Sequence, residues 1–199
     1  MSAHCSRGLG PPPTSQGSRH GAARSYGTGE KSALRRAIDN LHALSPTVFQ
    51  TSDFFFNLAR AAKRDFTVVA PFIDDHGANL LVELFSICEP GVRRHLICRP
   101  LSEPQCGEAF LGRAADFRRL KVLVYEYALP SILPSGRETF HAKIVLADDA
   151  EFYVGSSNFM ASALERSFEC GVIVRGETAK QLNSVLIAVR TIAKPSEHF

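Results

Sequence analysis

Blocks of apolar and polar residues alternate along most of the chain, and their length and period predict helices and strands in turn. Two early stretches, Glu30–Leu44 and Ser52–Lys63, have apolar residues at helical spacing. Short apolar, β-branched runs further on predict buried strands. We expect further helices at Ala78–Cys88, Cys106–Leu120 and Thr178–Ala193, and strands at Phe66–Phe72, Val92–Arg99 and Lys121–Tyr125.

Strands cluster in the second half of the chain. Three more apolar runs predict strands at Phe140–Ala147, Glu151–Val154 and Ser167–Val174, with a short helix at Phe159–Leu164 between the last two. Helices that alternate with strands, followed by clustered strands, are typical of an α/β protein. We therefore predict one domain over residues 30–199, an α/β sandwich in which helices flank both faces of a mixed sheet.

Residues 1–29 differ from the rest in composition. They are rich in Gly, Ser and Pro, contain Arg7, Arg19 and Arg24, and include no acidic residue. Such a segment cannot bury enough apolar surface to fold, so we expect a disordered tail. The arginines are able to contact a polyanion, but a solvated tail is the usual outcome of this composition.

The overall composition is that of a globular protein. The 199 residues are 45% hydrophobic and 22% charged, with a net charge of +3, which permits a polyanionic partner without requiring one. No apolar run reaches the length of a transmembrane segment, and the N-terminus lacks the apolar region of a signal peptide. The five cysteines form no C-x-x-C pair, so we expect reduced thiols, no metal site and a cytoplasmic location.

Candidate chemistry concentrates between His141 and Asn158. Side chains alternate along a strand, so His141 and Lys143 share one face and place an imidazole beside an ammonium. Ser156 and Asn158 follow Gly155 where the short helix is expected to begin, and a helix start offers free N–H groups. A nucleophilic imidazole, a cation, a hydroxyl and an amide together suit a phosphate group.

Two carboxylates accompany these groups. Glu169 is predicted on the inward face of the strand Ser167–Val174, where it would be costly unless paired and could hold the second nitrogen of His141. Cys170 then points to the other face, which favours a buried structural thiol. Asp148 ends the strand that carries His141, on the opposite face, so we expect it to be a structural turn residue.

At these spacings the residues resemble the HKD motif of the phospholipase D superfamily, H-x-K-x4-D-x6-G-S-x-N. All six fixed positions are matched, and Glu169 stands where nucleases of the family carry a glutamate. Six specified residues at fixed spacing rarely arise by chance in a chain of this length. The resemblance implies the family's α/β fold and a phosphodiesterase that needs no metal and no cofactor. The matched positions are His141, Lys143, Asp148, Gly155, Ser156 and Asn158.

The resemblance also implies how the residues act. His141 is expected to form a covalent phosphohistidine, while a second histidine protonates the leaving oxygen. The sequence contains one H-x-K, and family members with a single motif pair two copies across a two-fold axis, so we expect a homodimer. Lys143 and Asn158 would bind phosphate oxygens, and Ser156 would either support the phosphate or hold its loop. Glu169 would orient His141.

Three functions are compatible with this motif. The short, single-motif members of the family are typically endonucleases, so a nuclease acting on nucleic acid is the leading interpretation. A phospholipid phosphodiesterase would need an apolar rim, for which the loop Leu129–Pro134 is the candidate. A catalytically silent binding module would keep the fold without the activity.

Two other features have competing interpretations. His76 follows Asp74 and Asp75 in a loop, but three polar neighbours do not make a metal site, and a helix cap formed by one aspartate is the favoured interpretation. Arg99 ends a predicted strand, where a surface salt bridge is favoured over contact with substrate.

Overall fold

A computed structural model describes residues 33, 36, 37, 40, 50–103, 107–130 and 137–199. The predicted tail 1–29 and most of the predicted helix Glu30–Leu44 lie outside the described residues, although residues 33, 36, 37 and 40 are helical. All the helices and strands described below belong to the unit Ser32–Phe199, which is separate from Met1–Lys31.

Helices and strands alternate in the first part of this unit, and strands predominate in the second. The helices are α2 Thr51–Ala61, α3 Asp75–Ile87, α4 Gly107–Leu111, α5 Ala114–Arg119, the π-helical turn η1 Ser162–Arg166 and α6 Glu177–Ile192. The strands are β1 Asp65–Ala70, β2 Arg93–Cys98, β3 Val122–Glu126, β4 Leu129–Pro130, β5 Arg137–Glu138, β6 Lys143–Ala147, β7 Glu151–Gly155, β8 Gly171–Arg175 and β9 Lys194–Pro195.

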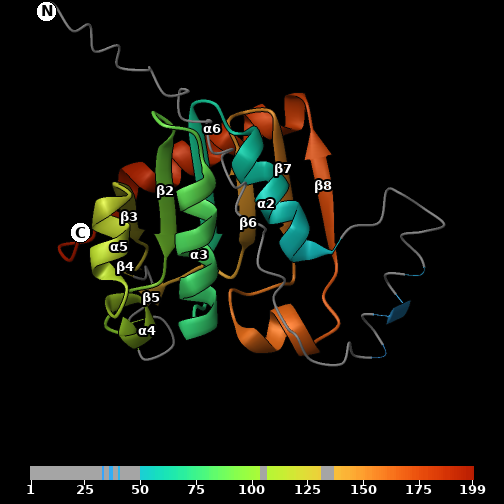
Figure 1. Ribbon diagram of the computed structural model, residues 1–199. Helices are drawn as coiled ribbons and strands as arrows, with labels where there is room; N and C mark the ends of the chain where they lie inside the picture. The colour runs from blue at the N-terminus through green and yellow to red at the C-terminus, as the bar shows by residue number, and fades with distance from the viewer. Residues whose placement is uncertain (1–32, 34–35, 38–39, 41–49, 104–106, 131–136) are drawn as a thin grey trace, which may run out of the picture. The chain divides into compact units, whose positions relative to one another are not determined.

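One mixed sheet of seven strands forms the centre of the fold (Figure 1). The strand order is β8-β7-β6-β1-β2-β3-β9. β1, β2 and β3 run parallel, whereas β6, β7, β8 and β9 are antiparallel to their neighbours. β4 and β5 pair with each other in the loop before β6. The predicted α/β fold with a mixed sheet is confirmed.

Helices cover both faces of the sheet, and each face has its own apolar core. On one face Phe55 of α2 and Phe85 of α3 pack in one cluster with Val68 of β1. On the other face Val69, the next residue of β1, packs in a second cluster with Leu186 of α6. In Figure 1, α2 and α3 lie in front of the sheet and α6 lies behind it. Two covered faces explain why the central strands are continuously apolar rather than alternating.

Two predicted helices differ from the observed ones. The described part of Cys106–Leu120 contains α4 and α5 with a turn between them. The predicted helix Phe159–Leu164 is replaced by η1, which begins only at Ser162. Phe159 is fully buried and pairs in a parallel bridge with Ile73, so its backbone stays extended and the helix starts later.

Two predicted strands are shorter than expected. The stretch Phe140–Ala147 becomes a strand only at Lys143, and Ser167–Val174 only at Gly171. The ladder ends at these residues because Gly155 of β7 pairs with Lys143 on one side and Gly171 on the other. Beyond this row the segments leave the sheet and become loops.

The start of α3 fixes the loop that follows β7. Asp74 caps the helix as predicted, because its Oδ1 accepts a hydrogen bond from Gly77 N at 2.9 Å. Its other oxygen, Oδ2, accepts from Ala161 N at 2.8 Å. Asp74 N in turn donates to Phe159 O at 3.1 Å. One aspartate therefore joins the loop after β1 to the loop after β7.

Gly77→Ala is expected to lower the free energy of unfolding by about 1–3 kcal/mol. A Cβ on Gly77 would overlap the backbone carbonyl of Phe159, so α3 and the loop after β7 would have to separate. In an open helix the same change usually stabilises. Gly112→Ala is the matched control and should be close to neutral, because a Cβ there lies no nearer than 3.4 Å to its neighbours. An unchanged urea midpoint for Gly77→Ala would contradict the close contact.

Candidate active site

The candidate residues other than Asp148 gather at one edge of the sheet, the lower edge in Figure 1. β1 and β2 run parallel and both end there, with Ala70 opposite Cys98. β6 begins at this edge and β7 ends at it, with Lys143 opposite Gly155. The segments that follow β1, β2 and β7 therefore meet the segment that precedes β6.

His141 and Lys143 form the centre of this edge. Lys143 is 4% exposed, and its Nζ donates to the carbonyl oxygen of His141 at 2.9 Å. The same Nζ lies 2.9 Å from Nδ1 and 3.0 Å from Nε2 of the exposed imidazole. The structure thus places a buried ammonium directly against the ring of His141.

The charges around this pair favour a neutral imidazole. The Lys143 ammonium is the main cause that lowers the pKa of His141, and burial and Arg99 add to it. Burial also lowers the pKa of Lys143, while Glu169 raises it and Arg99 lowers it. A neutral imidazole keeps a lone pair for nucleophilic attack, and the cation beside it attracts an anion.

Ser156 ties two loops together beside the pair. Its hydroxyl donates to Glu169 Oε2 and accepts from Cys170 N at 3.1 Å, and Ser156 N donates to Cys170 O at 3.0 Å. Of the two roles predicted for Ser156, these contacts correspond to holding the loop. Cys170 is exposed rather than buried as predicted, because it precedes β8 instead of lying in it.

Glu169 is not where strand alternation would put it. It is half-buried in the segment before β8, so the prediction that it lies in a strand is wrong. Its carboxylate accepts from Ser156 and raises the pKa of Lys143. Among the residues that the structure describes, it makes no contact with the imidazole of His141, and orientation of that ring by Glu169 stays a prediction.

Asn158 joins the group from the loop after β7. Its side chain is partly buried, and Oδ1 makes no hydrogen bond to any described residue, so this side chain is not committed to holding the fold. Two of the N–H groups between residues 156 and 161, where the sequence predicts free donors at a helix start, already have acceptors. Ser156 N donates to Cys170 O, Ala161 N donates to Asp74, and η1 begins only after them.

Gly155 is required by packing. A Cβ at this position would lie 2.6 Å from Cys170 O and would overlap the side chain of Tyr153. Gly171, its partner in β8, meets the same ring. The Tyr153 side chain therefore lies across two bare glycines at the strand ends, and this packing fixes the loops that carry Ser156 and Cys170.

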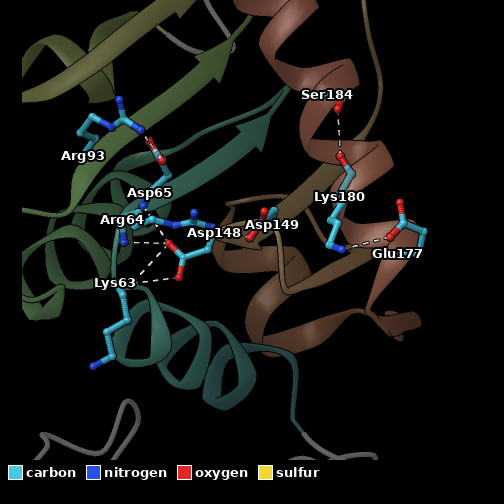
Figure 2. Close-up of polar contacts among 9 residues, drawn as sticks. All are labelled: Lys63, Arg64, Asp65, Arg93, Asp148, Asp149, Glu177, Lys180 and Ser184. Atoms are coloured by element: carbon cyan, nitrogen blue, oxygen red, sulfur yellow. Dashed lines mark hydrogen bonds and ion pairs between the residues drawn. The ribbon is translucent and has the colours of Figure 1, made fainter.

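Asp148 follows the other end of β6 from His141, and Figure 2 shows its carboxylate beside Lys63, Arg64 and Asp65. It has a positive φ of 58°, and its carboxylate accepts hydrogen bonds from the backbone N–H groups of Lys63 at 3.0 Å, Arg64 at 2.8 Å and Asp65 at 2.9 Å. At 3.2–3.4 Å per residue, the chain from His141 to Asp148 spans roughly 20 Å. The contacts of Asp148 are those of a structural turn residue.

Arg99 and Phe72 belong to the site by position, although the sequence did not assign them to it. Arg99 Nε and Nη2 donate to Phe140 O at 3.2 and 3.1 Å, and Arg99 Cζ lies 4.5 Å from the ring centroid of Phe72. The ring of Phe72 packs against that of His141 at 5.6 Å. The salt bridge favoured for Arg99 is not found among the described residues. The position of Arg99 at a strand end is the one local signal for it, and only the pairing of β1 with β2 and β6 brings Arg99 and Phe72 to the site.

No group of three His, Cys, Asp or Glu side chains that could hold a metal ion occurs within the described ranges. His76, for which a metal role was the alternative to a loop position, lies with Nε2 3.6 Å from Glu165 of η1. Within the described part of the chain, no helix combines the length and hydrophobicity needed to cross a membrane.

The sequence and the fold are similar to those of known proteins. A family profile described as "Cardiolipin synthase, PLD-like domain" matches residues 55–188. Nuc, a phospholipase D family member from Salmonella typhimurium, has a similar fold with a TM-score of 0.54 at 16% identity. NucT from Helicobacter pylori has a TM-score of 0.59 at 15% identity. Both similarities cover 72% of this chain and 89% of the other. A comparison with curated proteins gives no match.

Proposed function

The chain belongs to the phospholipase D superfamily of phosphodiester hydrolases, and on this premise we propose that it cleaves phosphodiesters through a covalent phosphohistidine. In this proposal it is a metal-independent nuclease that is active as a homodimer. The observation that carries the proposal is the contact between Lys143 Nζ and the imidazole of His141 at the sheet edge. A neutral histidine beside a buried cation is suited to attack an anionic phosphate.

In the proposed reaction one imidazole nitrogen of His141 attacks phosphorus, and the bond from phosphorus to the leaving oxygen breaks. The leaving oxygen takes a proton from His141 of the partner subunit. This second histidine then removes a proton from water, whose oxygen attacks phosphorus and releases the nucleophilic imidazole. Lys143 and Asn158 bind the non-bridging oxygens and stabilise the charge that develops on them.

Ser156 and Glu169 support the site in this proposal. Ser156 keeps the loop of Asn158 in place through its bonds to Glu169 and Cys170. Glu169 raises the pKa of Lys143, which opposes the effect of burial and helps to keep this lysine protonated. In the assembled dimer Glu169 is also the carboxylate expected to orient an imidazole.

The homodimer is inferred from the chemistry, because two histidines are needed in line and the sequence contains one H-x-K. The side of the sheet next to the site is able to accept a partner. β8 is the last strand on this side, and its Val172 is 57% exposed. Phe168, next to Glu169, is 74% exposed. A second copy related by a two-fold axis would cover these apolar side chains and supply the missing histidine.

The similarity to short members of the family favours nucleic acid as the substrate. Short, single-motif members are typically endonucleases, and the similarity extends over 89% of Nuc and NucT. A phospholipid is the alternative substrate, because the description of the matching family profile names cardiolipin synthase. The loop Leu129–Pro134, predicted as an apolar rim, lies mostly outside the described residues.

The deciding experiment offers single- and double-stranded DNA and RNA to the purified protein in excess EDTA, with the molar mass measured in parallel. We expect cleavage to continue in EDTA and the mass to be that of two chains. Cleavage that stops in EDTA would contradict metal independence. A folded dimer that hydrolyses cardiolipin vesicles but no nucleic acid would favour the phospholipid substrate, and a folded protein inactive on both would favour the silent module.

A further inference from the structure

Arg99 is held rigidly at the edge of the candidate site by contacts that leave part of its guanidinium unused. Nε and Nη2 both donate to a single acceptor, Phe140 O. The guanidinium also stacks over the ring of Phe72, with Cζ 4.5 Å from the centroid. Nη1 makes no hydrogen bond and no ion pair with any residue that the structure describes. Of the five N–H donors of the guanidinium, three therefore remain for a ligand, two on Nη1 and one on Nη2.

The position of this cation is unfavourable for the unliganded protein. Arg99 is half-buried, and its charge acts on two groups that are already in a positive environment, since it lowers the pKa of both Lys143 and His141. Like charges that are partly buried together cost free energy unless an anion joins them. A planar guanidinium with a fixed orientation is well suited to bind phosphate oxygens.

We propose that Arg99, supported by Phe72, binds a second phosphate next to the one attacked by His141. This inference rests on the proposed nuclease function and specifies its substrate as a polynucleotide. The guanidinium contacts Phe72 and Phe140 O but not the imidazole itself, so it is displaced from the reacting nitrogen. A phospholipid with one phosphate would fill only the site of His141 and Lys143, and cardiolipin, which carries two phosphates, is distinguished from a polynucleotide by whether the protein hydrolyses cardiolipin vesicles or nucleic acid. A polynucleotide presents another phosphate on the neighbouring nucleotide.

The test measures binding of a labelled single-stranded DNA oligonucleotide across a series of KCl concentrations, in a His141→Asn background that blocks turnover. Arg99→Gln is expected to weaken binding several-fold and to reduce the slope of log K against log salt concentration by about 0.7–1, the contribution of one phosphate contact. Arg99→Lys keeps the charge and should keep most of the slope. Arg93→Gln is the matched control, since Arg93 is an exposed arginine at the other end of β2 that pairs with Asp65 at 2.6 Å.

A second measurement uses the enzyme with His141 intact. Arg99→Gln should move the acid limb of the kcat/KM profile to higher pH, because the Arg99 charge lowers the pKa of His141. Cleavage of bis(4-nitrophenyl) phosphate, which has one phosphate, should retain its KM. An unchanged salt slope in folded Arg99→Gln, or an equal rise in KM for this diester and for the oligonucleotide, would overturn the second-phosphate role. Failure of the His141→Asn protein to bind any nucleic acid would instead overturn the nuclease function, and this inference with it.

Discussion

His141→Ala is expected to abolish phosphodiester cleavage, lowering kcat/KM by at least about 10^4-fold. Alanine leaves no nitrogen to attack phosphorus, and in a shared site it also removes the acid that protonates the leaving oxygen. Initial rates on the preferred nucleic acid in EDTA measure the loss. His198→Ala is the control, because His198 is an exposed residue near the C-terminus and its loss should leave the rate unchanged.

Mixed dimers sharpen this test. Dimers with one wild-type chain and one His141→Ala chain are isolated by means of two different affinity tags. If two histidines act on one phosphate, these dimers should be as inactive as the His141→Ala homodimer. About half of the wild-type activity in the mixed dimer would show that each copy works alone and would contradict the shared site.

Asp148→Ala should have the largest effect on stability, a loss of about 2–3 kcal/mol in the free energy of unfolding. The carboxylate accepts from three successive backbone N–H groups at the end of α2, and alanine would leave all three without this partner. The positive φ of 58° adds strain for alanine. Urea denaturation at a fixed protein concentration measures the loss.

Two variants separate the causes of this loss. Asp148→Asn keeps an acceptor oxygen and a side chain that tolerates positive φ, so it should lose less stability than alanine. Asp149→Ala removes the adjacent carboxylate, which pairs with Arg64 at the surface, and should change stability by less than about 1 kcal/mol. Equal destabilisation by Asp148→Ala and Asp149→Ala would contradict the special position of Asp148. The folded fraction of Asp148→Ala should keep the wild-type kcat.

The local sequence pattern predicts correctly the positions of residues inside the strands. Ile144 to Ala147 form a continuous apolar run, and β6 contains them as predicted. Lys143, two residues before Val145, begins the same strand and is buried like it. The motif places His141 two residues before Lys143. On an extended chain this spacing keeps the two side chains on one side, which predicts that His141 lies next to Lys143 at the edge of the sheet.

The misplaced and missed residues depend on contacts between distant segments. The pattern places Glu169 in a strand that in the structure begins only two residues further on, at Gly171, where the pairing with Gly155 starts and the ring of Tyr153 lies against both glycines. Arg99 reaches the site only because β2 lies beside β1 and β1 beside β6. Neither the packing of one ring nor the order of strands can be read from local periodicity.

The strand β6 carries His141 ahead of one end and Asp148 just beyond the other, so under the proposed function natural selection would act on the two residues for different reasons. Loss of the imidazole would end the proposed reaction and leave the fold, whereas loss of the aspartate would weaken the fold itself. In a lineage that no longer needs the reaction, histidine and lysine are therefore free to change first while the aspartate persists. A descendant that retains the aspartate alone would be a folded relic, and only a chain with the complete set remains a candidate enzyme.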